Sequence, residues 1–389
     1  MAKTVKELVS ENIYKDLQII MDADIPWDQL KNRSVLITGA GGFISYYLVC
    51  ALLAKNDVAG TNIQVLGLVR NKKRAEDKYG ELLERPDFKL YEQDVCDDFS
   101  IDEKADYVIH AASQASAWHF ENDPVGTINA NLTGTVKALE YAKKSESKST
   151  LFVSSLKVYG QVHDGSQTLK EEMVGYIDHT SYKNCYAQGK RAAETLCGSY
   201  HKQYGMSVKI ARPSYIYGPA RLDDDRVWAQ FIANVVKGES ILLKSNGAAY
   251  RSFCYVADTA AALLYILLKG EDMQPYNISA AVFLMDHTDD IGVFFHIAVG
   301  DSAGIILGTI VDDDDFHTVA AGEQTVHTVL HIILGIIARN RNCQKFHKFF
   351  LSFRFPYSSR ESVFIMASSR ALTTSKSATV SITSVYAFA

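Results

Sequence analysis

Near its start the chain carries an apolar run, three closely spaced glycines and a second apolar stretch, Val35-Leu36-Ile37-Thr38-Gly39-Ala40-Gly41-Gly42-Phe43-Ile44. The apolar run predicts a buried strand, and the glycines predict a tight turn from that strand into a helix. In such a unit the backbone N–H groups at the start of the helix can bind a phosphate group. This segment therefore favours an α/β fold built on parallel strands.

The alternation of strand and helix patterns continues along the chain. We predict strands at 34–38, 63–69, 88–91, 106–110, 150–153 and 207–211, and helices at 43–55, 125–144 and 181–204. Strands separated by helices indicate a Rossmann-type, doubly wound parallel sheet. Apolar residues at helical spacing over 5–22 predict an amphipathic helix that packs on this sheet domain.

A second signal lies in the predicted helix 181–204, where Tyr186 and Lys190 stand four residues apart. The two side chains share one face of the helix, so the ammonium can lower the pKa of the phenol and make it a base near neutral pH. Ser154 and Ser155 end an earlier apolar strand. Each signal alone is weak, but their order and spacing indicate a dinucleotide-dependent redox enzyme.

These motifs in this order resemble the short-chain dehydrogenase/reductase superfamily, and Val35 to Ser279 looks like its extended branch, the NAD-dependent nucleotide-sugar epimerases and dehydratases. The resemblance implies a catalytic trio of Ser155, Tyr186 and Lys190. Tyr186 would take a proton from a sugar hydroxyl, and Ser155 would hydrogen-bond the same oxygen. Lys190 would hold the ribose of the cofactor and stabilise the phenolate.

NAD is the cofactor that the resemblance implies. Gly39 allows the tight turn, Gly42 lets the start of the helix approach the phosphates, and Ser45 replaces the third glycine of the usual pattern. The predicted cofactor-binding residues are Gly39, Gly42, Phe43, Ile44, Arg70, Asp94, Val95, Ala111, Ala112, Ser113, Asn131, Tyr186, Lys190 and Pro213.

The end of the second strand leaves NADP open as an alternative cofactor. Arg70, Lys72 and Lys73 follow that strand, where NAD enzymes usually place an aspartate. Basic residues there favour the 2′-phosphate of NADP. The resemblance favours NAD, retained through a cycle that leaves it chemically unchanged.

The residues after Ser155 bear on the reaction that follows oxidation at C4 of a hexose. Dehydratases of this family carry an Asp-Glu pair there, whereas this chain has Leu156 and Lys157. Epimerisation, which needs no such pair, is therefore favoured over dehydration. Lys157 can also hydrogen-bond the keto oxygen or a substrate carboxylate, or point to solvent.

The segments 112–116, 123–128, 184–191, 200–203 and 251–256 resemble those of UDP-glucuronate decarboxylases, and this likeness extends over much of the first 260 residues. Two changes weaken that assignment, because the catalytic glutamate of those enzymes falls on Lys157 and their sugar-binding asparagine falls on Tyr215. Arg251 matches their active-site arginine. The predicted substrate-binding residues are Lys157, Tyr215, Arg226 and Arg251.

Composition excludes several other classes. The formal net charge of −5 gives no general reason to expect binding to nucleic acid or to an anionic membrane. The six cysteines show no metal-ligand spacing, and His327 and His331 lack a zinc signature, so we predict no metal site. We expect a cytoplasmic protein, because the N-terminus shows no signal peptide and no early segment could span a membrane. The family likeness implies a homodimer.

The chain divides into an N-terminal helical extension at 1–32, a dinucleotide-binding domain at 33–279 that includes part of a smaller sugar-binding lobe, and a tail at 280–389. The tail shows no resemblance to the family, although the lobe should be completed there. Two interpretations remain open: the lobe has diverged, or the reading frame shifts near residue 280.

Together these observations predict a nucleotide-sugar-modifying enzyme that works through a 4-keto intermediate with bound NAD, on a UDP-linked substrate. UDP-glucuronate decarboxylation is the alternative reaction. A non-catalytic NAD(P)-binding regulator is the alternative of another class, and the intact Ser155, Tyr186 and Lys190 argue against it.

Overall fold

The computed structural model describes residues 3–162, 169–224, 226–237, 239 and 252–279, and the backbone of six short strands beyond residue 293. The chain forms two compact units. The first comprises residues 1–219 and 251–282, and the second comprises residues 220–250 and 283–389.

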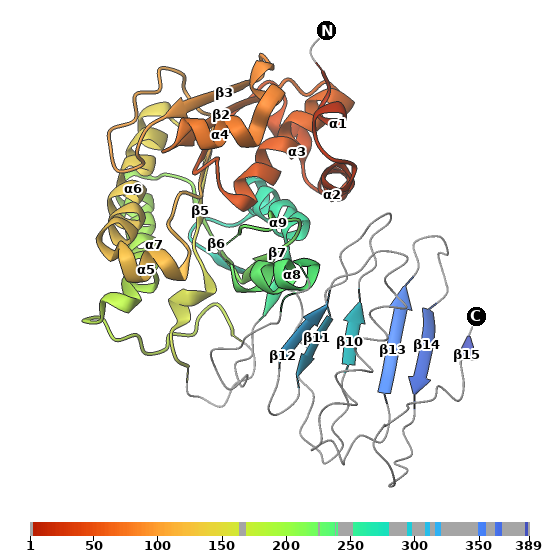
Figure 1. The fold of residues 1–389 in the computed structure, drawn as a ribbon. Coiled ribbons are helices and arrows are strands. Elements are labelled where there is room, and N and C mark those ends of the chain that lie inside the picture. Colours follow the sequence, from red (N-terminus) through yellow and green to blue (C-terminus); the bar gives the residue numbers. More distant parts are fainter. Residues whose placement is uncertain are drawn as a thin grey trace, which may run out of the picture. The chain divides into compact units, whose positions relative to one another are not determined.

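The first unit is built on a seven-stranded sheet in the order β3-β2-β1-β4-β5-β6-β9, and every neighbouring pair in it is parallel (Figure 1). Its strands are β1 (Ser34–Thr38), β2 (Gln64–Val69), β3 (Phe88–Glu92), β4 (Tyr107–His110), β5 (Ser149–Val153), β6 (Val208–Pro213) and β9 (Pro275–Ile278). The strand order reverses between β1 and β4, and ligands of open α/β sheets bind at such a point. The predicted Rossmann-type sheet is confirmed.

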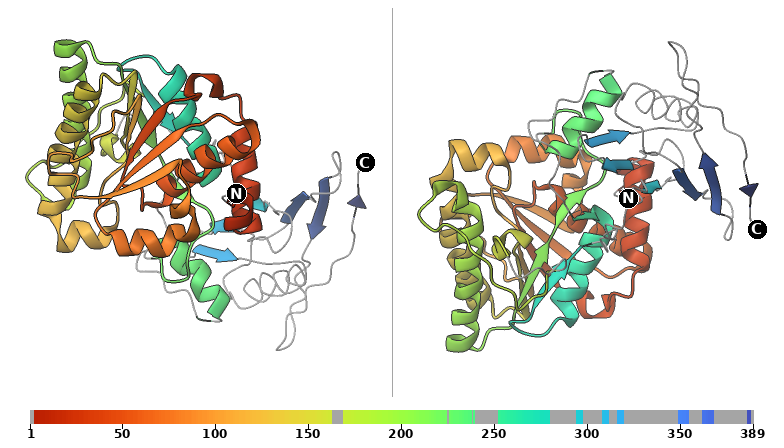
Figure 2. Two further views of the ribbon diagram at one scale, coloured as in Figure 1. Left: turned by 90° about the horizontal axis from the view of Figure 1, so that it is seen from above. Right: turned by 90° about the horizontal axis from the view of Figure 1, so that it is seen from below.

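Helices cover both faces of this sheet (Figure 2). Successive residues of β1 take part in the two cores. Val35 and Ile37 pack with α3 and α9 on one face, and Leu36 packs with α6 on the other. The helices of this unit are α1 (Val5–Leu8), α2 (Glu11–Asp22), α3 (Phe43–Ala59), α4 (Lys72–Tyr79), α5 (Ala117–Asn122), α6 (Pro124–Ser145), α7 (Cys185–Tyr204) and α9 (Val256–Lys269), with short 3₁₀ helices η1 (Trp27–Leu30), η2 (Gly80–Glu84), η3 (Leu156–Tyr159) and η4 (Tyr182–Asn184). Burial on both faces explains why the strands are almost continuously apolar.

The single helix predicted over 5–22 is wrong, because the segment forms two helices. Val9 and Ser10 are extended, and the Ser10 side chain accepts a hydrogen bond from the Ile13 N–H. A serine in this position caps the start of a helix, so α2 begins afresh after it.

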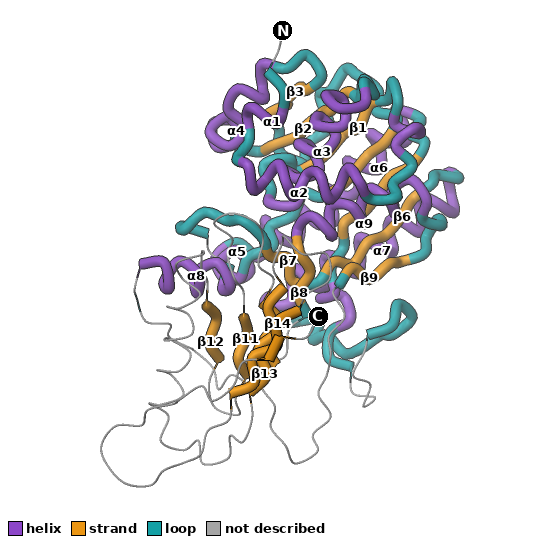
Figure 3. Tube along the Cα trace, turned by 90° about the vertical axis from the view of Figure 1, so that its right-hand side faces the viewer, coloured by secondary structure: helices purple, strands orange, loops and turns teal. Residues whose placement is uncertain are grey.

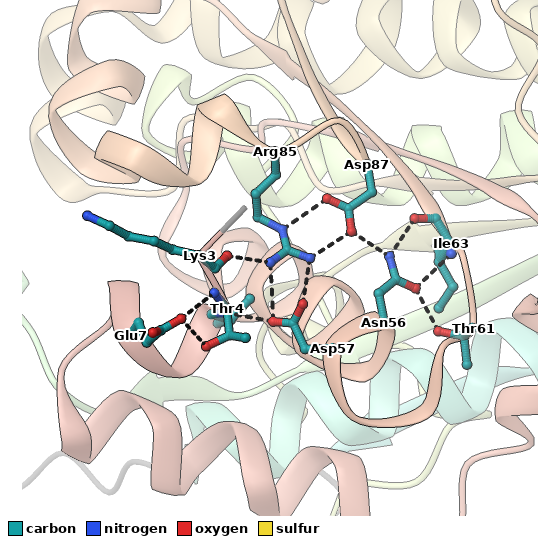
Figure 4. A network of polar contacts seen from close by, with 10 residues as sticks. Lys3, Thr4, Glu7, Asn56, Asp57, Thr61, Ile63, Arg85 and Asp87 are labelled. Atoms are coloured by element: carbon teal, nitrogen blue, oxygen red, sulfur yellow. Dashed lines mark hydrogen bonds and ion pairs between the residues drawn. The ribbon is translucent and has the colours of Figure 1, made fainter. Parts of the chain in front are cut away.

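The N-terminal segment is fixed to the sheet domain by a buried guanidinium (Figure 4). Arg85 is 7% exposed, and its Nη2 lies 2.8 Å from both Asp57 and Asp87. Its Nη1 donates to the Lys3 carbonyl at 3.0 Å, and the Val5 N–H donates to Asp57 at 2.7 Å. Both aspartates thus pair with one cation, as buried charges require.

A second contact joins α2 to the same unit. The Asp16 carboxylate is buried and accepts hydrogen bonds of 3.0 Å from the hydroxyls of Tyr47 and Tyr255. Tyr255 ends β8 (Phe253–Tyr255), which lies beside and parallel to β7 (Tyr215–Tyr217) (Figure 3). The extension is therefore packed on α3 and reaches β8.

The described part of the second unit contains α8 (Val227–Lys237) and six short strands. They are β10 (Phe294–Ile297), β11 (Gly308–Val311), β12 (Phe316–Val319), β13 (Phe349–Arg354), β14 (Ser362–Ala367) and β15 (Tyr386–Ala387). The order β10-β13-β14-β15 forms one sheet, and β11 and β12 form an antiparallel pair. The two interpretations of residues 280–389, a diverged lobe or a changed frame, remain predictions.

Candidate active site

The glycine turn between β1 and α3 forms an open cradle of backbone groups. Gly39 has φ +67°, and a Cβ added to it would lie 2.7 Å from the Ala112 Cα at the end of β4. Gly42 precedes α3 as its N-cap, and its N–H donates to the Gly39 carbonyl at 2.8 Å. Gly41 and Gly42 are exposed and have no side chains of their own, so a phosphate can approach the backbone at the start of the 17-residue α3. This geometry fits the pyrophosphate of a dinucleotide.

Two residues of α4 hold the carbonyl groups of this turn. The Tyr79 hydroxyl donates to the Ala40 carbonyl at 2.7 Å, and the Lys78 ammonium donates to the carbonyls of Gly41 and Gly42 at 3.1 and 2.8 Å. The sequence analysis missed both residues. Only the parallel pairing of β1 and β2 brings α4 to the turn, and no local pattern reports that proximity.

The other predicted cofactor residues line the carboxyl ends of the strands or the helices that follow. Phe43 and Ile44 open α3 and pack on the core, and Pro213 is buried at the end of β6. Val95 packs against Gly134 of α6, where an added Cβ would lie 2.8 Å from Val95. The neighbouring Asp94, Ala111 and Ala112 follow β3 and β4.

Asn131 connects the predicted cofactor side of the sheet with α7, the helix that carries Tyr186 and Lys190. Its side chain is fully buried, accepts a hydrogen bond from the Ser113 hydroxyl at 2.9 Å and donates to the Thr127 carbonyl at 2.9 Å. A Cβ added to Gly189 of α7 would lie 2.9 Å from the Asn131 Cβ. Gly189 therefore lets α7 approach α6 closely beside Tyr186.

Arg70 is exposed at the end of β2, as a 2′-phosphate ligand would have to be. Hydrogen bonds from Gln114 and from the Gly126 N–H lower the pKa of Asp123, and the charge of Arg70 lowers it further. The Arg70 guanidinium thus has a carboxylate in its neighbourhood, which partly compensates its charge.

The structure brings Ser155, Tyr186 and Lys190 together where β5 meets α7. Burial raises the pKa of Tyr186, and a hydrogen bond with the Ser155 side chain opposes that rise. Lys190 is 2% exposed, and its Nζ lies 2.8 Å from the Val153 carbonyl and 5.9 Å from the centre of the Tyr186 ring. Burial lowers the pKa of Lys190 to about 7, so both its charged and its neutral form are accessible near neutral pH.

Further residues support this trio, and of these the sequence analysis named only Ser154. The Phe120 ring of α5 stacks on Tyr186 with ring centres 5.1 Å apart. Below the site, the Glu194 carboxylate accepts a hydrogen bond from Ser154 at 2.6 Å and from Arg212 at 2.9 and 2.6 Å. These contacts tie β5, α7 and β6 together beneath the predicted catalytic residues.

A buried polar chain crosses the sheet under the cofactor side. The Ala112 N–H donates to Thr38 at 3.2 Å, and the Thr38 hydroxyl lies 2.8 Å from His110 Nδ1. His110 Nε2 lies 3.1 Å from the Thr135 hydroxyl, which donates to the Asn131 carbonyl at 2.6 Å. These roles assign the proton of the neutral imidazole to Nε2.

Of the predicted substrate residues, the structure brings Lys157 and Tyr215 together. The Lys157 ammonium lies 5.6 Å from the centre of the Tyr215 ring, and the Lys157 N–H donates to Ser155 Oγ at 3.2 Å. Burial is the main cause of the raised pKa of Tyr186, and Tyr215 raises it further. This effect indicates that the hydroxyls of Tyr215 and Tyr186 lie near each other.

The structure gives no position relative to this group for the two remaining predicted substrate residues. Arg226 belongs to the second unit, where its Nε donates to Asp224 at 2.7 Å. Arg251 lies outside the described residues.

Within the described part of the chain, no helix is long and apolar enough to cross a membrane. The same residues contain no group of three or more His, Cys, Asp or Glu side chains that could hold a metal ion. His327 and His331 lie outside them.

Comparison with known proteins identifies the family. Residues 35–279 match the model of the NAD dependent epimerase/dehydratase family. The chain is 34% identical to UDP-glucuronic acid decarboxylase 6 of Arabidopsis thaliana over 250 residues, which are 64% of this chain and 69% of that protein.

Two solved structures share the fold. The UDP-glucose 4-epimerase of Thermotoga maritima superposes with a TM-score of 0.53 at 23% identity, covering 63% of this chain and 76% of that one. The dTDP-glucose 4,6-dehydratase of Bacillus anthracis, determined in complex with NAD, superposes with a TM-score of 0.53 at 20% identity, covering 64% and 75%. The prediction of NAD as the cofactor is confirmed at the level of the family. With its parallel sheet, its glycine cradle and this match over residues 35–279, the chain belongs to the NAD dependent epimerase/dehydratase family.

Proposed function

We propose that the protein is a nucleotide-sugar-modifying enzyme that oxidises C4 of a UDP-linked hexose to a ketone and then reduces it again. The observation that carries this proposal is the meeting of Ser155, Tyr186 and Lys190 at the carboxyl edge of the same sheet whose glycine turn fits a pyrophosphate. An acid/base group beside a dinucleotide cradle is the combination that reversible sugar oxidation requires.

Each residue of the trio has a distinct task. The ionised Tyr186 takes the proton of the C4 hydroxyl while the C–H electron pair leaves as hydride and the C4=O double bond forms. NAD, when bound, supplies the acceptor and later the donor of that hydride. Ser155 hydrogen-bonds Tyr186 in the structure; with a sugar present, its hydroxyl would donate to the C4 oxygen instead and hold that oxygen against the base.

Lys190 makes the base available. Its ammonium, 5.9 Å from the Tyr186 ring, favours the phenolate, and its pKa of about 7 leaves part of the population charged at neutral pH. Gly39 and Gly42 would receive the pyrophosphate, and Ser113 and Asn131 would fix the strand end beside the nicotinamide ribose.

We further propose epimerisation as the net reaction. The ketone has to rotate and take the hydride back on its other face, and this requires no additional acid and base. Loss of water from C5 and C6 would require both, and Leu156 and Lys157 at the start of η3 supply no carboxylate pair.

Decarboxylation of UDP-glucuronate is the second candidate, favoured by the 34% identity to a UDP-glucuronic acid decarboxylase over 250 residues. Against it stand Lys157 and Tyr215 at the positions where the resemblance places a glutamate and an asparagine. A non-catalytic NAD(P)-binding regulator would have no need of the contacts that Ser155 and Lys190 make around Tyr186.

Product masses test the proposal directly. The protein is incubated with UDP-glucose and UDP-glucuronate, and we expect an isomer of unchanged mass, separable by chromatography. Decarboxylation would lower the mass by about 44 Da and dehydration by about 18 Da, because carbon dioxide or water then leaves the keto sugar. A product lighter by one water would refute our interpretation of Leu156 and Lys157.

A pair of tyrosine variants tests the trio. Tyr186→Phe should lower turnover by about 10²- to 10⁴-fold with little change in NAD affinity, since only the proton acceptor is removed. Tyr265→Phe is the matched control, because Tyr265 is an exposed tyrosine on α9. Full turnover in Tyr186→Phe, or equal losses in both variants, would contradict the assignment.

A further inference from the structure

The reacting end of the site carries an exposed cation. Lys157 lies in η3, two residues after Ser155, and its backbone N–H donates to the Ser155 hydroxyl oxygen at 3.2 Å. Its side chain is exposed, and none of the described carboxylates forms an ion pair with its ammonium. The charge is therefore available to a ligand that enters beside Ser155.

An aromatic ring holds this cation near the catalytic hydroxyls. The Lys157 ammonium lies 5.6 Å from the centre of the Tyr215 ring, within the range of a cation–π contact. Tyr215 is 39% exposed, its N–H donates to the Ser252 carbonyl at 3.1 Å, and its ring packs against Phe253 at 5.8 Å. The ring is thus fixed on β7, and the side chain of the lysine that lies over it is exposed.

The position of this cation matters because of hexose geometry. C6 is joined to C4 through C5 alone, so a group that flanks the oxygen at C4 can also reach a substituent at C6. A hexose offers a neutral hydroxymethyl group there, whereas a uronate offers a carboxylate. A lysine ammonium forms a charge-assisted hydrogen bond with a carboxylate and only an ordinary one with a hydroxyl.

We propose that Lys157, seated on the Tyr215 ring, makes the site selective for UDP-sugars whose hexose carries a carboxylate at C6. This inference rests on the proposed function, because it assumes that a nucleotide-linked hexose is placed with C4 at Tyr186. It assigns to Lys157 the choice of substrate and no part in proton transfer.

Calorimetry on the full-length protein loaded with NAD tests the inference. The ligands are UDP-glucuronate, UDP-glucose and UDP alone. We expect UDP-glucuronate to bind at least about tenfold more tightly than UDP-glucose, which corresponds to about 1.4 kcal/mol. Raising the salt concentration should reduce that ratio, since part of the charge is exposed to solvent.

Variants of Lys157 separate the carboxylate contact from general effects. Lys157→Gln should abolish the preference while leaving the affinities for UDP-glucose and UDP within about threefold, and Lys157→Arg should keep most of it, because the positive charge is retained. Lys202→Gln, which removes an exposed lysine in the last turn of α7, is the charge-matched control and should keep the full preference.

The outcomes distinguish this inference from the function on which it rests. Equal affinities for the two sugars in the wild type, or an undiminished preference in Lys157→Gln, would overturn the role of Lys157 and leave the proposed function standing. Failure of all three UDP ligands to bind would overturn both.

Discussion

Helix α7, which carries Tyr186 and Lys190, offers a prediction in which two of its glycines respond in opposite ways to the same change. Gly189 and Gly198 both lie in the interior of α7. A Cβ at Gly189 would lie 2.9 Å from the Asn131 Cβ, whereas one at Gly198 would lie 3.3 Å from the terminal methyl of Met273. Gly189→Ala and Gly198→Ala therefore add the same group against a rigid and a flexible neighbour.

Two effects compete at each position. Alanine in a helix interior is favoured over glycine by about 0.5–1 kcal/mol. Overpacking costs about 1–3 kcal/mol where the neighbour cannot move, because carbon atoms prefer separations of about 3.5–4.0 Å. The Asn131 Cβ is attached to the backbone of α6, and its amide is held by Ser113 and Thr127, whereas the Met273 methyl can rotate away.

The net change in the free energy of unfolding has opposite signs at the two positions. We expect Gly189→Ala to destabilise the fold by about 1–2 kcal/mol and Gly198→Ala to stabilise it by up to about 1 kcal/mol. A difference of about 2 kcal/mol corresponds to about 4–8 °C in Tm, which thermal unfolding followed by circular dichroism resolves. If Gly189→Ala unfolds at or above the temperature of Gly198→Ala, the close approach of α6 and α7 at Asn131 is not a constraint on this helix.

Three further outcomes are expected. Lys190 has a pKa of about 7 in the folded protein and 10.5 ordinarily, so between these pH values the unfolded chain binds more protons and this group makes the free energy of unfolding rise with pH. The difference in that free energy between wild type and Lys190→Met, measured by urea unfolding, should therefore grow from pH 7 to 10. A difference that stays constant with pH would contradict the burial of Lys190. Tyr47→Phe should cost about 1.5–3 kcal/mol in urea unfolding, because a hydrogen bond to the buried Asp16 carboxylate is lost, and an unchanged midpoint would rule out that contact. Gly39→Ala should weaken NAD binding at least about tenfold in calorimetry, since φ is +67° and the added Cβ meets Ala112 at 2.7 Å; unchanged affinity would refute the cradle.

The sheet and its order of elements could be predicted because each buried strand and each helix carries its own local pattern. The predicted strand at 34–38 coincides with β1, and the predicted helix at 125–144 differs from α6 by one residue at each end. The helix predicted over 5–22 failed for a local reason as well, since the capping signal of Ser10 was overlooked within an apolar periodicity.

The residues of the candidate site likewise fall into those that a local sequence pattern predicts and those that it does not. Ser155, Tyr186 and Lys190 could be recognised because their spacing within the chain is itself the signal. Phe120 and Lys78 could not, because each acts on a residue far away in sequence that only the parallel sheet brings near. Neither a stacked aromatic ring nor a lysine that donates to a carbonyl produces a periodic pattern in the sequence.

His110 shows how burial and long-range contacts, which the sequence does not reveal, affect the protonation states of the site. Burial, with a smaller contribution from the charge of Lys190, lowers the pKa of His110 to about 3, so the imidazole is neutral at physiological pH. The hydroxyls of Thr38 and Thr135 satisfy both ring nitrogens in that neutral state. A protonated histidine would add a second positive charge close to Lys190 and would lower its pKa further. Because burial keeps His110 neutral, Lys190 is able to hold its proton at neutral pH, which the proposed ionisation of Tyr186 requires.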